Sequence, residues 1–248
     1  MLAPAGESLG SGYSTRMHPD PPPPIRFHVG KGYALFEGPS GDNAPHRHAA
    51  FQVAIAPQGE VAISDGTQLH AAPVLVVPPL LRHQMQPIAR LRNYFIEPHC
   101  RFADLLREGC GSGITAMPQL HDLREEQVRS LGASASLSVD ARLQQVMNAL
   151  SMPGDRSMPE LARQAGLSPQ RLRALAQEQL GMPLARWRIW QRFGLAAKAV
   201  STGGGLADAA LAAGFADQAH LSRQMREMFG VPPSQLLPLL RSQVFSAT

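Results

Sequence analysis

The sequence is poor in the features that mark secreted scaffolds and membrane proteins. Its 248 residues include two cysteines, Cys100 and Cys110, which are too few for a disulfide framework and fit a reducing compartment. No apolar run reaches the roughly 18 residues that a membrane span needs. The first residues lack a basic segment followed by an apolar stretch, so no secretory signal is expected. These absences predict a cytoplasmic protein that does not enter membranes.

Signatures of common enzymes are missing as well. The chain contains no Ser-His-Asp signature, no phosphate-binding glycine loop and no pair of acidic residues with catalytic spacing. We therefore predict no catalytic residues and expect that the protein is not an enzyme.

Positive charge is concentrated in the second half of the chain. Residues 1–138 contain 11 Lys and Arg against 12 Asp and Glu, whereas residues 139–248 contain 12 against 7. Arginine supplies nearly all of this excess, because Lys198 is the only lysine after residue 138. Guanidinium groups bind phosphates and guanine edges bidentately, which makes the bias compatible with DNA contact. A solvated basic surface explains the charge more simply than DNA contact does. The sequence motifs must therefore distinguish these two interpretations.

Composition divides the chain into four parts. Residues 1–24 are rich in Gly, Ser and Pro and predict a disordered arm. Residues 25–100 alternate short β-prone runs with turn residues, which predicts a small antiparallel barrel or jelly roll. Residues 101–138 are expected to form a linker with a helix near 120–131. Residues 139–242 are predicted to be all helical, so the fold class is α+β.

Hydrophobic periodicity gives the expected elements more closely. The predicted strands include 32–37, 51–56, 59–64 and 74–77. The predicted helices of the last part are 139–150, 158–165, 169–180, 183–201, 205–212, 218–229 and 233–241.

The helical part contains a weak internal repeat. Residues 161–168 (LARQAGLS) and 209–217 (AALAAGFAD) each place a glycine and a capping residue after an Ala-rich helix. A glycine adopts the left-handed turn conformation easily, and a Ser or Asp caps the helix that follows. Each copy therefore predicts a helix-turn-helix unit, whose second helix enters the major groove of DNA.

The second copy also carries a long motif. GFADQAHLSR at 214–223, continued by FGVPPS at 229–234, resembles the C-terminal signature of the AraC/XylS family of transcription regulators. Arg192 and Ala196 in the connecting helix also fit, and the resemblance covers about residues 139–240. It implies two helix-turn-helix units, joined by one long helix at 183–201, that bind adjacent major grooves of double-stranded DNA.

The resemblance also assigns DNA contacts by position. Arginine suits guanine, glutamine suits adenine, and both can bind phosphate. The implied DNA-binding residues are Gln170, Arg171 and Arg173 in the first unit and Gln218, His220, Arg223 and Gln224 in the second. Ala176 and Met225 stand where family members often have an aromatic side chain, so the helices are expected to pack slightly differently.

Histidine is concentrated in the front half, which holds eight of the nine. The spacing of His46, His48 and Gln52, followed by His83, resembles the two motifs of the cupin family. That family implies a β-barrel whose histidines and one carboxylate point inward and bind a divalent metal. Here Gln52 occupies the carboxylate position, and a neutral amide is a poorer ligand for a divalent ion.

Three interpretations of these histidines stay open. They bind a divalent metal, they line the pocket of a small effector, or they only form hydrogen bonds within the barrel. A thinner alternative is a soft-ligand or redox site at His99, Cys100 and Cys110, although two isolated thiols are usually inert.

The combined patterns predict a transcription regulator that senses a small molecule or a metal in a cupin-like front domain. Dimerisation is common in the family, so a homodimer is among the expected partners, together with RNA polymerase. We take an activator as the working expectation, with a repressor as the open alternative. The alternatives are a metal-dependent cupin enzyme with a DNA-binding tail, and a front domain that serves only for dimerisation while DNA binding is constitutive.

Overall fold

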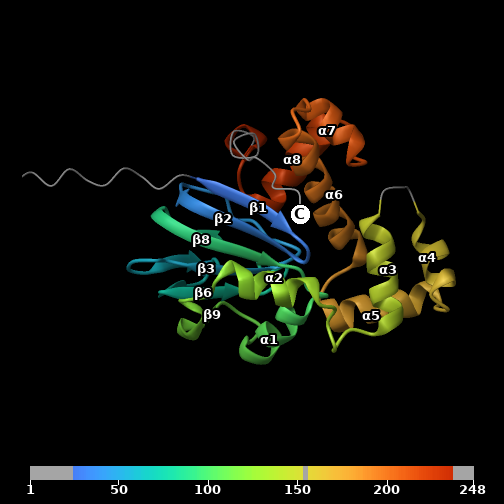
Figure 1. Cartoon of the computed structure of the whole chain (residues 1–248), viewed down its shortest axis with the longest axis horizontal. Helices are drawn as coiled ribbons and strands as arrows, with labels where there is room; N and C mark the ends of the chain where they lie inside the picture. Colours follow the sequence, from blue (N-terminus) through green and yellow to red (C-terminus); the bar gives the residue numbers. More distant parts are fainter. Residues whose placement is uncertain (1–24, 153–155, 237–248) are drawn as a thin grey trace, which may run out of the picture.

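A sheet-forming part is followed by a helical part in the computed structural model, which describes residues 25–152 and 156–236 (Figure 1). This arrangement confirms the predicted α+β class. The arm expected at 1–24 and the end of the helix expected at 233–241 lie outside the described residues. Within the described ranges, no helix combines the length and the apolar character that crossing a membrane requires.

Two antiparallel sheets make up the first part. The larger sheet has six strands in the order β1-β2-β8-β3-β6-β9 and the smaller has three in the order β5-β4-β7. The strands of the larger sheet are β1 (Arg26–Gly30), β2 (Tyr33–Ser40), β8 (Ile88–Ile96), β3 (Phe51–Ile55), β6 (Val74–Val77) and β9 (Thr115–Ala116). Those of the smaller sheet are β5 (Leu69–Ala72), β4 (Val61–Ser64) and β7 (Gln84–Met85). All four runs predicted as strands contain one.

Side-chain alternation in β3 explains how the larger sheet is covered. Val53 and Ile55 lie on one face, where they pack with the helices that follow the strands. Gln52 and Ala54 lie on the other face, because successive side chains of a strand point to opposite sides. All five residues of β3 are buried, so both faces of the sheet centre are covered.

The helices after the strands cover the first face of the larger sheet. They are α1 (Arg101–Gly109), the short 3-10 helix η1 (Pro118–Leu120) and α2 (Glu125–Ala133). The helix expected at 120–131 thus begins later, at Glu125. Its start is set by Gln127, whose side chain accepts a hydrogen bond from the Arg124 backbone N–H at 2.9 Å, and by two acidic residues in the first turn.

The helical part closely matches the predicted set. Its helices are α3 (Ala141–Ser151), α4 (Met158–Gln164), α5 (Pro169–Leu180), α6 (Leu184–Ser201), α7 (Leu206–Ala212) and α8 (Gln218–Phe229). Gly166 and Gly214 adopt φ of 66° and 80° in the two turns, the left-handed conformation that glycine tolerates. Ser168 and Asp217 accept hydrogen bonds from the first turns of α5 and α8, as the sequence predicts.

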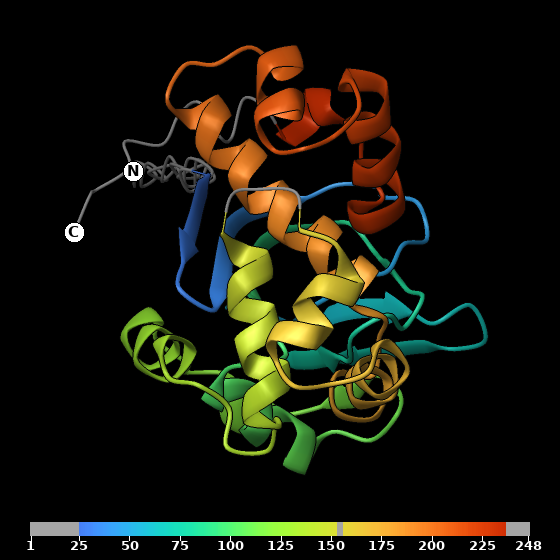
Figure 2. The same cartoon turned by 90° about the vertical axis from the view of Figure 1, so that its right-hand side faces the viewer.

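The two parts share one hydrophobic core. Ala34, Ala49 and Phe95 of the sheet part belong to the same buried cluster as Trp190 and Met225 of the helices. Figure 2 shows α6 running across the molecule between the first helix-turn-helix unit and the second, with the sheet behind it. The predicted domain limits at residues 100, 138 and 242 therefore stay predictions.

Candidate DNA-binding surface and effector site

The first helix-turn-helix unit presents its predicted contacts to solvent. Gln170, Arg171 and Arg173 on α5 are all exposed, whereas Leu172 and Leu175 between and beyond them are buried. One face of α5 therefore packs in the core, and the opposite face, which carries the predicted contacts, is exposed to solvent.

The second unit repeats this division on α8. Gln218 and Arg223 are exposed, and Leu221 and Met225 are buried. Met225 is 6% exposed, and Ala176 at the matching position of α5 is fully buried. The positions where the family often has aromatic side chains are thus core positions here too, filled by smaller or more flexible residues.

His220 and Gln224 are less exposed than the other predicted contacts. The backbone N–H of Ala216 donates to Nδ1 of His220 at 3.3 Å, and the His220 ring lies edge-on to Phe215 with centroids 5.5 Å apart. The Oε1 atom of Gln224 is buried and has no hydrogen-bond partner among the described residues. The His220 side chain therefore supports the turn before α8, whereas Gln224 is only partly exposed.

Arg226 extends this surface beyond the residues that the sequence assigned. It is exposed and lines a shallow groove of about 420 Å³ together with Gln218, Ala219, Ser222 and Arg223. Residues three and four apart share one helix face, so Arg226 follows Arg223 on the same side of α8. The helical spacing from Arg223 was the signal that could have found it.

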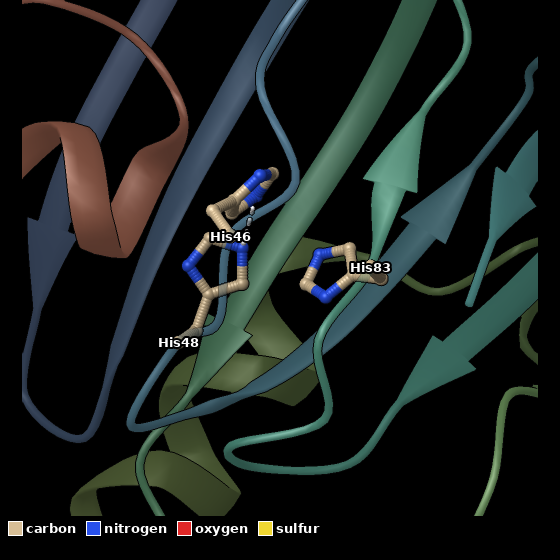
Figure 3. Close-up of side chains that lie close together, drawn as sticks. All are labelled: His46, His48 and His83. Atoms are coloured by element: carbon tan, nitrogen blue, oxygen red, sulfur yellow. Dashed lines mark hydrogen bonds between the residues drawn. The ribbon is translucent and has the colours of Figure 1, made fainter. Parts of the chain in front are cut away.

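The predicted histidines and Gln52 do come together, in a buried cluster. His46, His48, Gln52 and His83 are 6%, 4%, 2% and 1% exposed. Figure 3 shows the three imidazoles gathered around one point, with ring centroids 4.5 to 5.0 Å apart. Burial lowers the pKa of all three histidines, that of His83 to about 4, so the rings are neutral at pH 7.

Backbone pairing, rather than a shared strand, creates this cluster. His46 and His83 form an isolated antiparallel bridge with reciprocal hydrogen bonds of 2.9 Å. The Leu80 N–H donates to the His48 carbonyl at 2.8 Å. Leu80 has φ of 61°, a left-handed conformation that is unfavourable for a branched residue. Glycine adopts this conformation without strain, so Leu80 holds a backbone geometry that is more typical of glycine.

A cavity of about 920 Å³ lies between the larger sheet and the helical part. Its apolar wall combines sheet residues such as Ala34 and Phe95 with Trp190, Phe193 and Phe229 from the helices. His46, His48 and Gln52 form part of the wall, so the histidine cluster adjoins the cavity.

Polar atoms without partners are concentrated around this cavity. Nδ1 of His48, Oδ1 of Asn93, Nδ1 of His99 and Oε1 of Gln144 are buried and make no hydrogen bond to the described residues. All four residues line the cavity. Buried polar atoms are nearly always paired with protein, water or ligand, so water or a bound molecule can satisfy these atoms.

Glu97 connects the sheet to the connecting helix at the cavity wall. Its carboxylate accepts hydrogen bonds from Nε2 of Gln191 at 2.9 Å and Nε1 of Trp190 at 3.4 Å. Burial raises the pKa of Glu97 to about 7, although these two donors partly oppose that effect. The sequence offered no signal for this residue, because its partners lie far along the chain.

Burial keeps both cysteines in the thiol form. Cys100 is 2% exposed, and burial raises the pKa of both thiols to about 11. Redox-reactive cysteines need the thiolate form, which this burial disfavours, and the soft-ligand alternative at these residues stays a prediction.

Known proteins show similarity to the helical part and to the whole fold. A family model described as a helix-turn-helix domain matches residues 161–238. ToxT from Vibrio cholerae O395 covers 86% of this chain and 100% of its own, with 10% identity and a TM-score of 0.57. No curated protein sequence matches significantly.

Two further solved structures are similar. ToxT from Vibrio cholerae strain SCE256, with a bound unsaturated fatty acid, covers 85% of this chain and 96% of its own, at 10% identity and a TM-score of 0.51. A probable AraC family transcriptional regulator from Rhodopseudomonas palustris CGA009 covers 41% and 99%, at 24% identity and a TM-score of 0.38. The likeness to ToxT shows a shared fold.

Proposed function

We propose that this chain is a DNA-binding transcription regulator with a helix-turn-helix domain of the AraC/XylS type, and that a small apolar molecule bound between its two parts controls it. The observation that carries this proposal is the cavity shared by the sheet and the helices. Its volume of about 920 Å³ lies within the range of small-molecule sites, roughly 300–1,000 Å³.

The position of the cavity supports a regulatory role for its occupant. A molecule there would contact Phe95 of the sheet and both Trp190 and Phe229 of the helices. Such a molecule binds most tightly to one arrangement of the two parts, and only this difference in affinity can shift a conformational equilibrium. The occupant would thereby favour one placement of the recognition helices.

The lining also indicates the chemical class of the effector. The wall is mainly apolar, with a few polar atoms such as Oδ1 of Asn93 and Nδ1 of His99 still unpaired. An elongated apolar molecule with one polar group fits this wall. The unsaturated fatty acid bound to ToxT belongs to this class, and oleic acid is therefore a suitable first probe.

Gly194 provides a direct test of the cavity. It lines the cavity, and a Cβ added there would meet no atom within 4 Å. We expect oleic acid to raise the Tm of the wild type and of Gly194→Ala, because ligand binding stabilises the folded state by mass action. Gly194→Phe should occupy part of the cavity and reduce the Tm rise. An equal rise in Gly194→Phe, measured by thermal denaturation, would place the ligand elsewhere.

The DNA contacts have their own test. Selection from a random DNA pool should enrich an asymmetric site whose two halves lie about one helical turn apart. On that site we expect Arg223→Ala to weaken binding by about 1–3 kcal/mol and to relax preference at one base pair. Arg90→Ala, at an exposed position of β8, is the matched control in a binding titration. Unchanged operator selectivity in Arg223→Ala would contradict the assignment.

The enzymatic alternative fits the geometry less well. Phe229 and Trp190 of the DNA-binding part lie against the His48 ring, with centroids 5.7 and 6.5 Å away. Helices of the proposed DNA-binding part cover the histidine cluster. This position suits control of those helices better than entry of a substrate. Homodimerisation and contact with RNA polymerase stay predictions from the family resemblance.

A further inference from the structure

We propose that His46, His48 and His83 bind a divalent transition-metal ion through their Nε2 atoms, and that this ion controls the position of recognition helix α8. The inference deepens the proposed function and rests on it for the DNA-binding readout. Its basis is the hydrogen bonding of the three imidazoles together with the contacts between their loop and α8.

Two of the rings are held in one tautomer by the backbone. Nδ1 of His46 lies 2.8 Å from the Ala44 carbonyl oxygen, and Nδ1 of His83 lies 2.9 Å from that of Leu81. A carbonyl oxygen only accepts, so both Nδ1 atoms carry the hydrogen and both Nε2 atoms present a lone pair. Histidine ligands of metals are oriented by the same kind of contact.

The atoms opposite these lone pairs are donors only in particular assignments of their hydrogens. Nε2 of His46 lies 3.1 Å from Nε2 of His48. If His48 donates from Nε2, its Nδ1 becomes the acceptor, and that atom is buried without a partner. Nε2 of His83 faces Oε1 of Gln52 at 2.8 Å. Rotation of the Gln52 amide would relieve this second contact, but it leaves the first unchanged.

A metal ion would satisfy all three rings at once. Their ligand atoms lie within 4.8 Å of one another, and tetrahedral coordination at about 2.0–2.1 Å places two nitrogens about 3.3 Å apart. The 3.1 Å separation between His46 and His48 is close to that value. Three neutral imidazoles favour Zn²⁺, Co²⁺ or Ni²⁺ over Mg²⁺ or Ca²⁺, which prefer oxygen ligands.

The loop that holds His46 and His48 also holds the end of α8. The Ala44 N–H donates to the Gly230 carbonyl at 2.9 Å, and the Arg47 N–H donates to the Glu227 carbonyl at 3.4 Å. The Glu227 side chain forms ion pairs with Arg47 and with Arg186 of α6. Glu227 therefore joins the sheet part, the connecting helix and the second recognition helix.

The packing at this junction leaves no spare space. A Cβ added to Gly230 would lie 2.3 Å from the Ala44 carbonyl oxygen and 2.7 Å from Nδ1 of His46. A displacement of His46 on metal binding is therefore transmitted directly to Gly230 and α8. Because α8 carries Gln218 and Arg223, the effect should fall on the half-site that the second unit binds.

The first experiment measures metal binding to the full chain. Protein freed of metal by chelator dialysis is titrated with Co²⁺, followed by its visible absorption, and with Zn²⁺ against a chromophoric chelator. We expect one equivalent of either ion, lost in His83→Ala and kept in His121→Ala, whose side chain is 41% exposed. Binding below one-tenth of an equivalent would overturn the site while leaving the effector cavity and the Arg223 test untouched.

The second experiment measures the coupling to DNA. Footprinting of the selected operator with and without Zn²⁺ should show an affinity change of about 5–150-fold at the second half-site, lost in His83→Ala. Glu227→Gln, which alters the junction and no ligand, should keep the metal and reduce the change. A metal-loaded protein with the same affinity as the metal-free form would overturn the control of α8. Failure to bind DNA in either state would instead contradict the proposed function, and the titration would still decide the metal site.

Discussion

Replacing Asp104 with alanine is expected to destabilise the protein by about 3–5 kcal/mol, the range found when one partner of a buried charge network is removed. The Asp104 side chain is 4% exposed and accepts hydrogen bonds from Oγ of Ser136 and Ser138, both at 2.6 Å, and from the Leu137 N–H at 2.8 Å. Arg107 pairs with it at 3.0 Å. Alanine would leave all these donors without their acceptor.

The same network holds the linker between the two parts. Residues 136–138 lead into α3, and Asp104 lies on α1 beneath the sheet. The last residues of the predicted linker are thus held against α1. Releasing them should also reduce the response of DNA binding to an effector, because movement would no longer pass from one part to the other.

Urea denaturation at pH 7 measures the expected loss, with Asp122→Ala as the control because the Asp122 side chain is fully exposed. Burial opposes ionisation of Asp104, but the bonds from Ser136, Ser138 and Leu137 and the pairing with Arg101 prevail and lower its pKa. A carboxyl group whose pKa is lowered by folding stabilises the folded state at pH values above its pKa in the unfolded chain. This stabilisation is lost as the pH falls through the pKa of the folded state. The gap between wild type and Asp104→Ala should therefore narrow in acid. A loss below 1 kcal/mol at pH 7 would refute this role.

Replacing Glu97 with glutamine is expected to make the protein less sensitive to pH. The Glu97 side chain is 18% exposed, and burial raises its pKa to about 7. For a carboxyl group this means that the folded state holds its proton more tightly than the unfolded state does. The stabilisation that protonated Glu97 contributes is complete below the pKa of this group in the unfolded chain, about 4.5. It is lost as the pH rises through 7.

The free-energy difference between Glu97→Gln and wild type should therefore shift by about 2–3 kcal/mol in favour of the variant between pH 4.5 and pH 8. His99 lies near Glu97, with Nδ1 3.8 Å from Oε2, but its pKa is lowered to about 4, so it stays neutral in this window. Denaturation curves across the pH range measure the shift, and Glu60→Gln, at an exposed position, is the control. Parallel pH profiles would show that the carboxyl group ionises normally.

The helices of the DNA-binding part could be predicted because their signals are local. The bounds of α5 and α8 agree with the predicted 169–180 and 218–229, since caps, glycine turns and apolar spacing act within a few residues. The short strands β5, β7 and β9 were harder to foresee. β7 and β9 have two residues each, too few for a periodicity, and β5 has four, only one of them buried, so these strands depend on their partner strands.

The candidate site was partly foreseeable in the same sense. His46, His48 and His83 could be selected by their spacing, and Arg223 by its motif. The burial of the histidines could not be predicted, because burial of His48 depends on Phe229 and Trp190 from the other end of the chain. Glu97 and Asp104 carried no sequence signal, since an isolated acidic residue is usually exposed.

The α+β class, the two helix-turn-helix units of the last part and the exposed faces of α5 and α8 could all be predicted from the sequence. Local hydrogen bonds and helical periodicity decide these properties. The contact of the histidine loop with the end of α8, the cavity between sheet and helices, and the attachment of the linker to Asp104 became visible in the tertiary structure alone. These contacts join residues such as Ala44 and Gly230, whose approach depends on how whole elements pack rather than on any nearby residue.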